Sequence, residues 1–181
     1  MKLQDIISAS QNKPARFRAW LAFATRAEAE LDAKGDIKVE HLQDGAGTTV
    51  CGMTSRDEKI SENPTAQEIV AGYWKYWSKS ESESLPLGVG EVVADLSLLC
   101  GMGRAAEWLQ HAIADTGIPI KCDGLIGEDT IAKAWKVNSQ ALAEDILEQG
   151  VDHFHRIATG GRVCFLKGWL KRAEALKEFI A

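Results

Sequence analysis

No stretch of this sequence approaches the ~20 consecutive apolar residues that a membrane-spanning helix needs, so we expect no membrane span. The net charge is −5 and the basic residues form no long run, which argues against nucleic acid as a partner. Residues 1–5 carry no apolar run of the kind found in a secretory signal. We therefore expect synthesis in a cytoplasm, with any target in the cell envelope reached with help.

Motifs for metals, phosphates and redox chemistry are also missing. The four cysteines are widely separated and no two stand at Cys-x-x-Cys spacing, which excludes a zinc or thioredoxin-like motif and predicts buried or partly buried free thiols. There is no glycine-rich phosphate loop, and the histidines show no metal spacing beyond His153-x-His155. We expect neither a metal site nor a cofactor.

Helical periodicity dominates the rest of the chain. With 181 residues, 45% of them hydrophobic, the chain can form one sizeable core with a small appended lobe. The polar run 78–84 is expected to be a mobile connection. Apolar residues recur at helical spacing over 17–31, 64–77, 92–99, 105–113, 139–157 and 165–176.

A carboxylate interrupts the first apolar stripe. Glu28 falls near the middle of the face formed by Phe17, Trp20, Leu21 and Ala24, one turn after Ala24. A carboxylate on a core-facing stripe is costly unless it is paired or protonated. A carboxylic acid kept protonated by apolar surroundings is what glycoside hydrolysis requires as its proton donor. The alternative is that the helix ends near residue 27 and Glu28 simply reaches water.

One interval has the pattern of strands. Residues 37–42 alternate apolar and polar side chains, 43–47 carry turn residues, and 48–51 form a short β-branched return. A helix with an inward glutamate, then a hairpin, then a helical body is similar to the order of elements in lysozyme-like muramidases. The expected fold is therefore mainly α (lysozyme-like α+β), a helical bundle with one small β-hairpin lining a cleft.

Four motifs in order resemble glycoside hydrolase family 108, N-acetylmuramidases of phages and of some bacterial secretion systems that carry a small C-terminal peptidoglycan-binding module. The family's hairpin segment Asp-Pro-Gly-Gly-x-Thr-x-Tyr-Gly-Ile-Thr is similar to residues 44–54, Asp-Gly-Ala-Gly-Thr-Thr-Val-Cys-Gly-Met-Thr. Its Asp-rich helix start, followed by Gly-x-Gly-Arg-Ala-Ala and Leu-Gln, resembles residues 95–110. The module signature Asp-Gly-x-x-Gly-x-x-Thr matches 123–130, and the terminal Phe-Leu-x-Gly-Trp-x-x-Arg matches 165–172.

The chain departs from this family at several positions. The family's Glu-Gly-Gly is replaced by Glu28-Ala29-Glu30, the hairpin Tyr by Cys51, and an Asn of the Asp95 helix by Leu99. The gap from Glu28 to the Asp44 segment is also longer than is usual in the family. Glu30 and Glu40 therefore remain alternative candidates for the acid.

The resemblance implies catalytic roles for three residues. Glu28 would donate the proton, Asp44 would be the ionised second carboxylate, and Thr49 would hydrogen-bond an attacking water. For Asp44, the alternative is a turn residue that accepts backbone N–H bonds. Thr54, two residues after Gly52, is expected either to contact substrate or to order the Asp44 loop.

Further candidates for substrate binding lie along the helices. Tyr73 and Trp77 could stack on sugars, although core packing explains them equally well. Asp95 could be a third carboxylate of the cleft, or it could satisfy backbone donors at a helix start. Asp123 and Thr130 belong to the module signature, which also reads as a turn followed by a helix cap.

The resulting functional hypothesis is a peptidoglycan hydrolase of the endolysin type that lyses bacterial cell walls by cleaving the β-1,4 bond between N-acetylmuramic acid and N-acetylglucosamine. We expect a muramidase body over 1–104 with the hairpin near 37–52, and a peptidoglycan-binding-like helical lobe over 105–181 packed on it. The protein would be a monomer, made in the host cytoplasm and acting in the periplasm after release through a holin or a secretion route. The alternative is a catalytically degenerate protein that binds peptidoglycan or serves as a structural part of a phage or secretion apparatus.

Overall fold

The computed structural model describes residues 1–42, 47–54 and 60–181, without the side chains of 41 and 42. The chain divides into two compact units, Met1–Lys75 and Tyr76–Ala181. The boundary between these two units falls within a helix. The boundary expected at 104 is of another kind, because it separates two groups of sequence motifs. The two-domain division at 104 stays a prediction.

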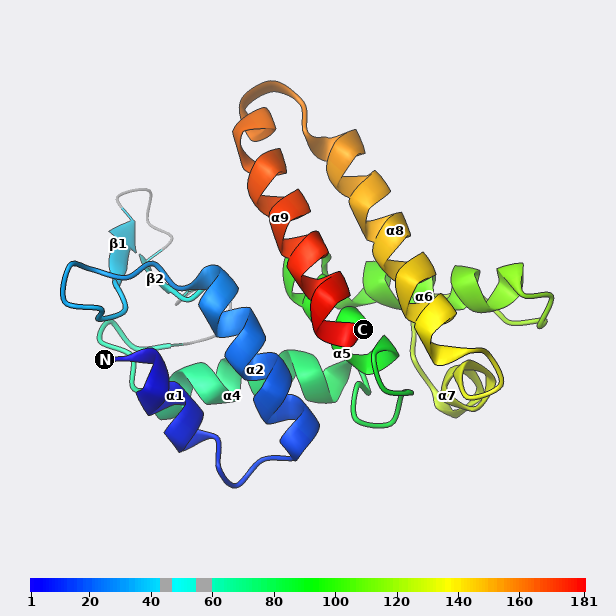
Figure 1. Cartoon of the computed structure of the whole chain (residues 1–181), viewed down its shortest axis with the longest axis horizontal. Coiled ribbons are helices and arrows are strands. Elements are labelled where there is room, and N and C mark those ends of the chain that lie inside the picture. Colours follow the sequence, from blue (N-terminus) through cyan, green and yellow to red (C-terminus); the bar gives the residue numbers. More distant parts are fainter. Residues whose placement is uncertain (43–46, 55–59) are drawn as a thin grey trace. The chain divides into compact units, whose positions relative to one another are not determined.

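The first unit combines helices with a small antiparallel sheet (Figure 1). The strand order is β1-β2-β3, so the expected hairpin is present and is extended by a third short strand. The elements are α1 (Leu3–Ala9), α2 (Ala15–Glu28), β1 (Glu40–Leu42), β2 (Gly47–Val50), β3 (Met53–Thr54) and the first turns of α4 (Ala66–Lys79).

Aromatic rings hold α2 against the first turns of α4. Phe17 meets Trp74 edge to face at 5.0 Å between ring centroids, and Trp20 meets Tyr73 at 5.6 Å. Phe17, Trp20 and Tyr73 have no exposed surface. The apolar stripe of residues 17–24 is therefore core, as its periodicity predicted.

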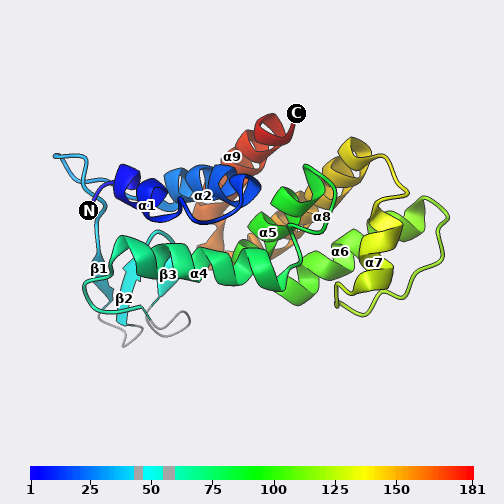
Figure 2. The same ribbon diagram turned by 90° about the horizontal axis from the view of Figure 1, so that it is seen from below.

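The second unit is helical, and its helices α5, α6, α8 and α9 pack on one another (Figures 1 and 2). Helix α8 approaches α5 so closely at Gly150 that a Cβ there would lie 2.8 Å from Leu96 Cδ2. Besides the end of α4, the unit contains α5 (Val89–Cys100), α6 (Met102–Asp115), α7 (Glu128–Ala134), α8 (Ser139–Ile157), the 3₁₀ turn η1 (Gly160–Arg162) and α9 (Val163–Ile180).

The polar run 78–84 is not the mobile connection that its composition predicted. Helix α4 continues to Lys79, and Ser80 and Ser82 are buried. Their hydroxyl oxygens lie 2.7 Å apart, and the Ser82 N–H donates to the Trp77 carbonyl at 3.1 Å. Hydroxyls that are paired in this way can be buried at little cost, so low complexity here accompanies an ordered turn.

Helix α4 begins with a capping box formed by Thr65 and Glu68. Thr65 Oγ1 accepts from the Glu68 N–H at 3.3 Å, and Glu68 Oε2 accepts from the Thr65 N–H at 2.8 Å. The Ser61 N–H donates to the other Glu68 carboxylate oxygen at 2.9 Å. These bonds, those from the Thr65 and Ser61 backbone first, lower the pKa of Glu68 to about 2.

The Glu68 cap predicts a pH-dependent stability. Because its folded pKa lies below the ordinary value of 4.5, the stabilising contribution of Glu68 is complete above that pH and is lost as pH falls toward about 2. Glu68→Gln should flatten the decline of the urea midpoint over this interval, measured by circular dichroism. The control is Glu62→Gln at an exposed position, which should follow the wild type. Parallel curves for wild type and Glu68→Gln would contradict the assignment.

Candidate active site

Glu28 is the last residue of α2, and its carboxylate lies against the turn between β2 and β3. An ideal Cβ added at Gly52 would come within 2.6 Å of Glu28 Oε2 and 2.9 Å of its Cδ. Such an approach is possible only because Gly52 has no side chain and adopts φ +71°. The glutamate is half-buried. Helix α2 therefore ends close to residue 27, as the alternative interpretation predicted. The Glu28 side chain nevertheless contacts the β2–β3 turn.

The two competing glutamates have other surroundings. Glu30 is exposed and pairs with Lys38, whose Nζ lies 3.4 Å from Glu30 Oε2. Glu40 is exposed on β1. Among the described residues considered for the acid, Glu28 alone combines partial burial with contact to the β2–β3 turn.

Thr49 and Thr54 lie side by side on the sheet together with Glu40. In the strand register Thr49 is directly opposite Glu40 on β1 and Thr54 on β3, so the three side chains share one face. Thr49 Oγ1 is buried and has no hydrogen-bond partner among the described residues. The hydroxyl is thus available for a further bond. Asp44, the expected second carboxylate, lies outside the described residues.

The turn that holds Gly52 is fixed from α4. The Tyr73 hydroxyl donates to the Cys51 carbonyl at 2.8 Å, and Cys51 adopts φ 46°, which is unusual for a residue with a side chain. Burial raises the pKa of the Cys51 thiol to about 11. Since the thiolate is the reactive form, Cys51 is not a nucleophile at neutral pH and acts through its backbone.

Gly52→Ala tests the effect of displacing Glu28 separately from the effect of lost stability. The new methyl would displace the Glu28 carboxylate. With Glu28 as the acid that the sequence predicts, a shift of about 1 Å at the reacting group should cost about a hundredfold in rate. The control is Gly35→Ala, which has a similar φ of +75° but nothing within 4 Å of the added Cβ. Both variants should lose a similar ~1 kcal/mol through backbone strain. Equal activities of the two variants would contradict the placement.

Tyr73 and Trp77 do not serve as sugar platforms in this structure. Each has no exposed surface, so neither ring can lie against a glycan strand. Tyr73 supports the Cys51 carbonyl, and the Trp77 indole N–H donates to Glu83 Oε2 at 3.0 Å. The predicted binding role is therefore corrected to packing, the alternative that their helical spacing also allowed.

Asp95 forms a buried ion pair with Arg172. The Arg172 Nε donates to Asp95 Oδ2 and its Nη2 to Oδ1, both at 2.9 Å. Asp95 is 1% exposed and Arg172 8%, and burial lowers the pKa of the guanidinium to about 10. A residue so enclosed cannot contact substrate, so the structure gives Asp95 a role in joining α5 to α9.

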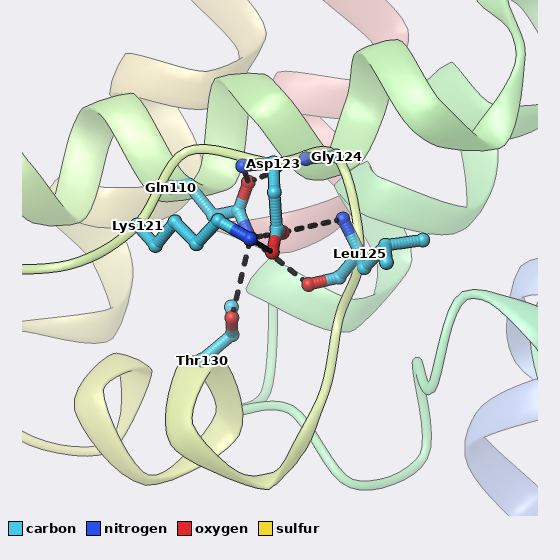
Figure 3. A network of polar contacts seen from close by, with 6 residues as sticks. All are labelled: Gln110, Lys121, Asp123, Gly124, Leu125 and Thr130. Atoms are coloured by element: carbon cyan, nitrogen blue, oxygen red, sulfur yellow. Dashed lines mark hydrogen bonds and ion pairs between the residues drawn. The ribbon is translucent and has the colours of Figure 1, made fainter.

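The signature loop of residues 123–130 is organised by Gln110 (Figure 3). Its Oε1 accepts from the N–H groups of Asp123 and Gly124, both at 2.9 Å. Its Nε2 donates to Asp123 Oδ1 at 3.0 Å, to the Leu125 carbonyl at 2.9 Å and to Thr130 Oγ1 at 3.4 Å. Asp123 and Thr130 thus face a buried amide, and that bonding defines the loop's conformation.

Asp123 also forms an ion pair with a lysine that precedes the loop. Lys121 Nζ lies 3.1 Å from Asp123 Oδ2, and the bonds from Gln110 and Lys121 lower the pKa of Asp123. The role of Gln110 was not predicted, although it ends a quoted motif. A glutamine at a core-facing helix position was the signal that could have identified it.

The four cysteines differ in their burial. Cys51 is buried, Cys100 is intermediate, and Cys122 and Cys164 are exposed, so the expectation of burial is wrong for the last two.

No group of three His, Cys, Asp or Glu side chains suited to a metal is found in the described part of the chain. In that part there is also no helix with the length and apolarity needed to cross a bilayer.

Together the elements define a mainly α, lysozyme-like fold in which a glutamate at a helix end meets a small sheet. The fold is similar to the structure of Brucella abortus SagA, with a TM-score of 0.69, 23% identity, and coverage of 90% of this chain and 91% of that one. Residues 104–174 match a family model described as a predicted peptidoglycan domain. No curated protein sequence matches the chain.

The family match supports the peptidoglycan module expected from the 123–130 signature and, with it, peptidoglycan as a partner. At 23% identity the likeness to SagA establishes the fold alone. A hydrolytic activity is a further step.

Proposed function

We propose that this protein is a muramidase that cleaves the β-1,4 bond between N-acetylmuramic acid and N-acetylglucosamine in peptidoglycan. The observation that carries this proposal is the placement of the Glu28 carboxylate against the Gly52 turn. A half-buried carboxylic acid at the end of a helix, beside a small sheet, is arranged to deliver a proton to a glycan bound along that sheet.

In the proposed reaction, Glu28 protonates the glycosidic oxygen as the bond to the anomeric carbon breaks. A second carboxylate, Asp44, stabilises the positive charge that develops on the sugar ring. The Thr49 hydroxyl, buried and without a described partner, orients the water whose oxygen bonds to the anomeric carbon. The proton that this water loses passes to the Asp44 carboxylate or back to the ionised Glu28. Water thereby supplies the new hydroxyl at the reducing end. Thr54, opposite Thr49 in the register, lies on the same face for substrate contact.

The match to the predicted peptidoglycan domain supports the same target. In this proposal residues 104–174 hold the chain on the wall while the first unit carries the reaction. The protein is synthesised in the host cytoplasm, reaches the periplasm through a holin or a secretion route, and acts there as a monomer. Membership of glycoside hydrolase family 108 belongs to this proposal.

Two features favour a second candidate, a lysozyme-like protein that binds peptidoglycan without cleaving it. The Gly-Gly that follows the acid in the family is Ala29-Glu30 here, and the hairpin Tyr is Cys51. Such a protein would be a structural component of a phage or secretion apparatus. The two candidates differ in one measurable property, the formation of new chain ends.

The test is incubation of the wild-type chain with purified Gram-negative peptidoglycan, followed by turbidity and by reduction of new chain ends with borohydride. The muramidase proposal expects clearing and reduced N-acetylmuramic acid termini. Reduced N-acetylglucosamine termini would indicate cleavage of the other glycosidic bond and would overturn the bond assignment. Protein that stays folded, pellets with the wall and releases no termini would favour the binding candidate.

A further inference from the structure

A cluster of basic side chains lies where the start of α6 passes the end of α8. The Arg104 Nη1 lies 3.2 Å from the His153 Nε2. The Trp108 and His153 rings are 5.5 Å apart between centroids. The pKa of His153 is lowered, first by partial burial and then by the nearby charges of Arg104 and Arg156. Both arginines are thus close to one imidazole, and both side chains are exposed.

Neither guanidinium has a carboxylate partner among the residues that the structure describes. No described Asp or Glu oxygen lies within 4.0 Å of Arg104 or Arg156, although ion pairs elsewhere in this unit use Lys121, Lys133 and Arg172. The arginine guanidinium presents a planar set of charged donors that matches a carboxylate. Two such groups beside one imidazole repel each other, so an anion bound between them would relieve that repulsion.

The protein surface is concave beside this basic cluster. A surface cavity of about 400 Å³ is lined by Trp108, Gln149, Asp152, His155 and Arg156. Gln149 is held by its bond to the Trp108 carbonyl at 3.2 Å. Asp152 is the one carboxylate among these lining residues, and His155 and Arg156 lie near it on α8. Glu107 lies one turn after Arg104 on α6.

We propose that this hollow, with Arg104 and His153 at its edge, is a binding site for the carboxylates of the peptidoglycan peptide stem. The inference rests on peptidoglycan as the target and extends it, because the lactyl carboxyl that carries each peptide stem is an amide, so the free carboxylates of intact material lie on the stems. All the residues involved lie within 104–174, the segment that matches the predicted peptidoglycan domain. The site gives a chain of net charge −5 a local attraction to an acidic polymer.

The test is a pelleting assay with the full chain carrying Glu28→Gln, so that the wall is not consumed. Intact peptidoglycan is compared with chitin, an insoluble β-1,4 glycan of N-acetylglucosamine that carries neither peptide nor carboxylate. Arg104→Ala with Arg156→Ala should weaken binding to intact peptidoglycan about tenfold or more and leave any binding to chitin unchanged. The matched control is Lys167→Ala with Lys171→Ala, two exposed cations on α9, which should bind as the parent does.

Each outcome separates the site from the activity. Equal binding of peptidoglycan and chitin, or equal loss in the control pair, would overturn the peptide-stem site and leave the muramidase proposal in place. Peptide-dependent binding by a chain whose wild type releases no chain ends would support the site and overturn the hydrolase. Absence of any binding would overturn the site together with peptidoglycan as the partner.

Discussion

Glu28→Gln is expected to reduce the release of reducing ends from peptidoglycan by at least about a hundredfold, because general acid catalysis contributes on the order of 10²–10⁴ in rate. The amide has nearly the shape of the acid and carries no transferable proton. Because Glu28 is half-buried at the end of α2, the fold should tolerate the change. The measurement is initial rate at saturating wall, with the urea midpoint recorded for the same preparations.

Glu30→Gln is the matched control for this prediction. Glu30 lies two residues further on, is exposed, and contacts Lys38, a surface pair worth little to stability. Its variant should retain wild-type activity. Loss in Glu30→Gln with activity retained in Glu28→Gln would move the acid to Glu30, two residues beyond the helix end. Equal activity of all three proteins would remove both glutamates from the reaction.

Asp95→Ala should destabilise the second unit by about 3–5 kcal/mol, because it leaves a guanidinium buried without its counterion. Arg172 is only 8% exposed and makes two bonds to Asp95 at 2.9 Å. The measurement is urea unfolding followed by far-UV circular dichroism. The double variant Asp95→Leu with Arg172→Met should recover most of the loss, since neither charge then remains to be desolvated.

The control for the ion pair is Asp129→Ala. Asp129 pairs with Lys133 one turn later on α7, and its side chain is 70% exposed, so the expected change is below about 1 kcal/mol. If Asp95→Ala were equally mild, water would have to reach Arg172, and the pair would not be the joint between α5 and α9. A double variant no more stable than Asp95→Ala would indicate that the pair stabilises the unit through the geometry of its two hydrogen bonds and not by neutralising a buried charge.

Local pattern was sufficient for much of this fold. The apolar stripe of 17–24 and the alternation near 37–51 each depend on neighbours within a few residues, and both predicted the correct element. The placement of Glu28 on that stripe drew attention to a residue that the structure brings to the β2–β3 turn. Periodicity reports which face of an element is inward, and for Glu28 that was the information required.

Contacts between distant segments were not predictable in the same way. Asp95 and Arg172 each stood in a separate motif, and nothing local shows that residues 77 apart form one ion pair. Ser80 and Ser82 looked solvated because composition does not reveal a pairing of two hydroxyls. Tyr73 and Trp77 satisfied the pattern of core and of sugar platform alike, and only their burial distinguishes the two.

The hydrogen bonds of Gln110 predict a sequence pattern that can be searched for in other proteins. Its side chain must accept through one atom and donate through the other, and among similar side chains an amide alone does both. A glutamate there would set a second negative charge against Asp123. Proteins that share this loop should therefore carry glutamine 13 residues before the aspartate and 20 before the threonine. In a genome, that spacing would distinguish chains that build this loop from those that merely repeat its glycines.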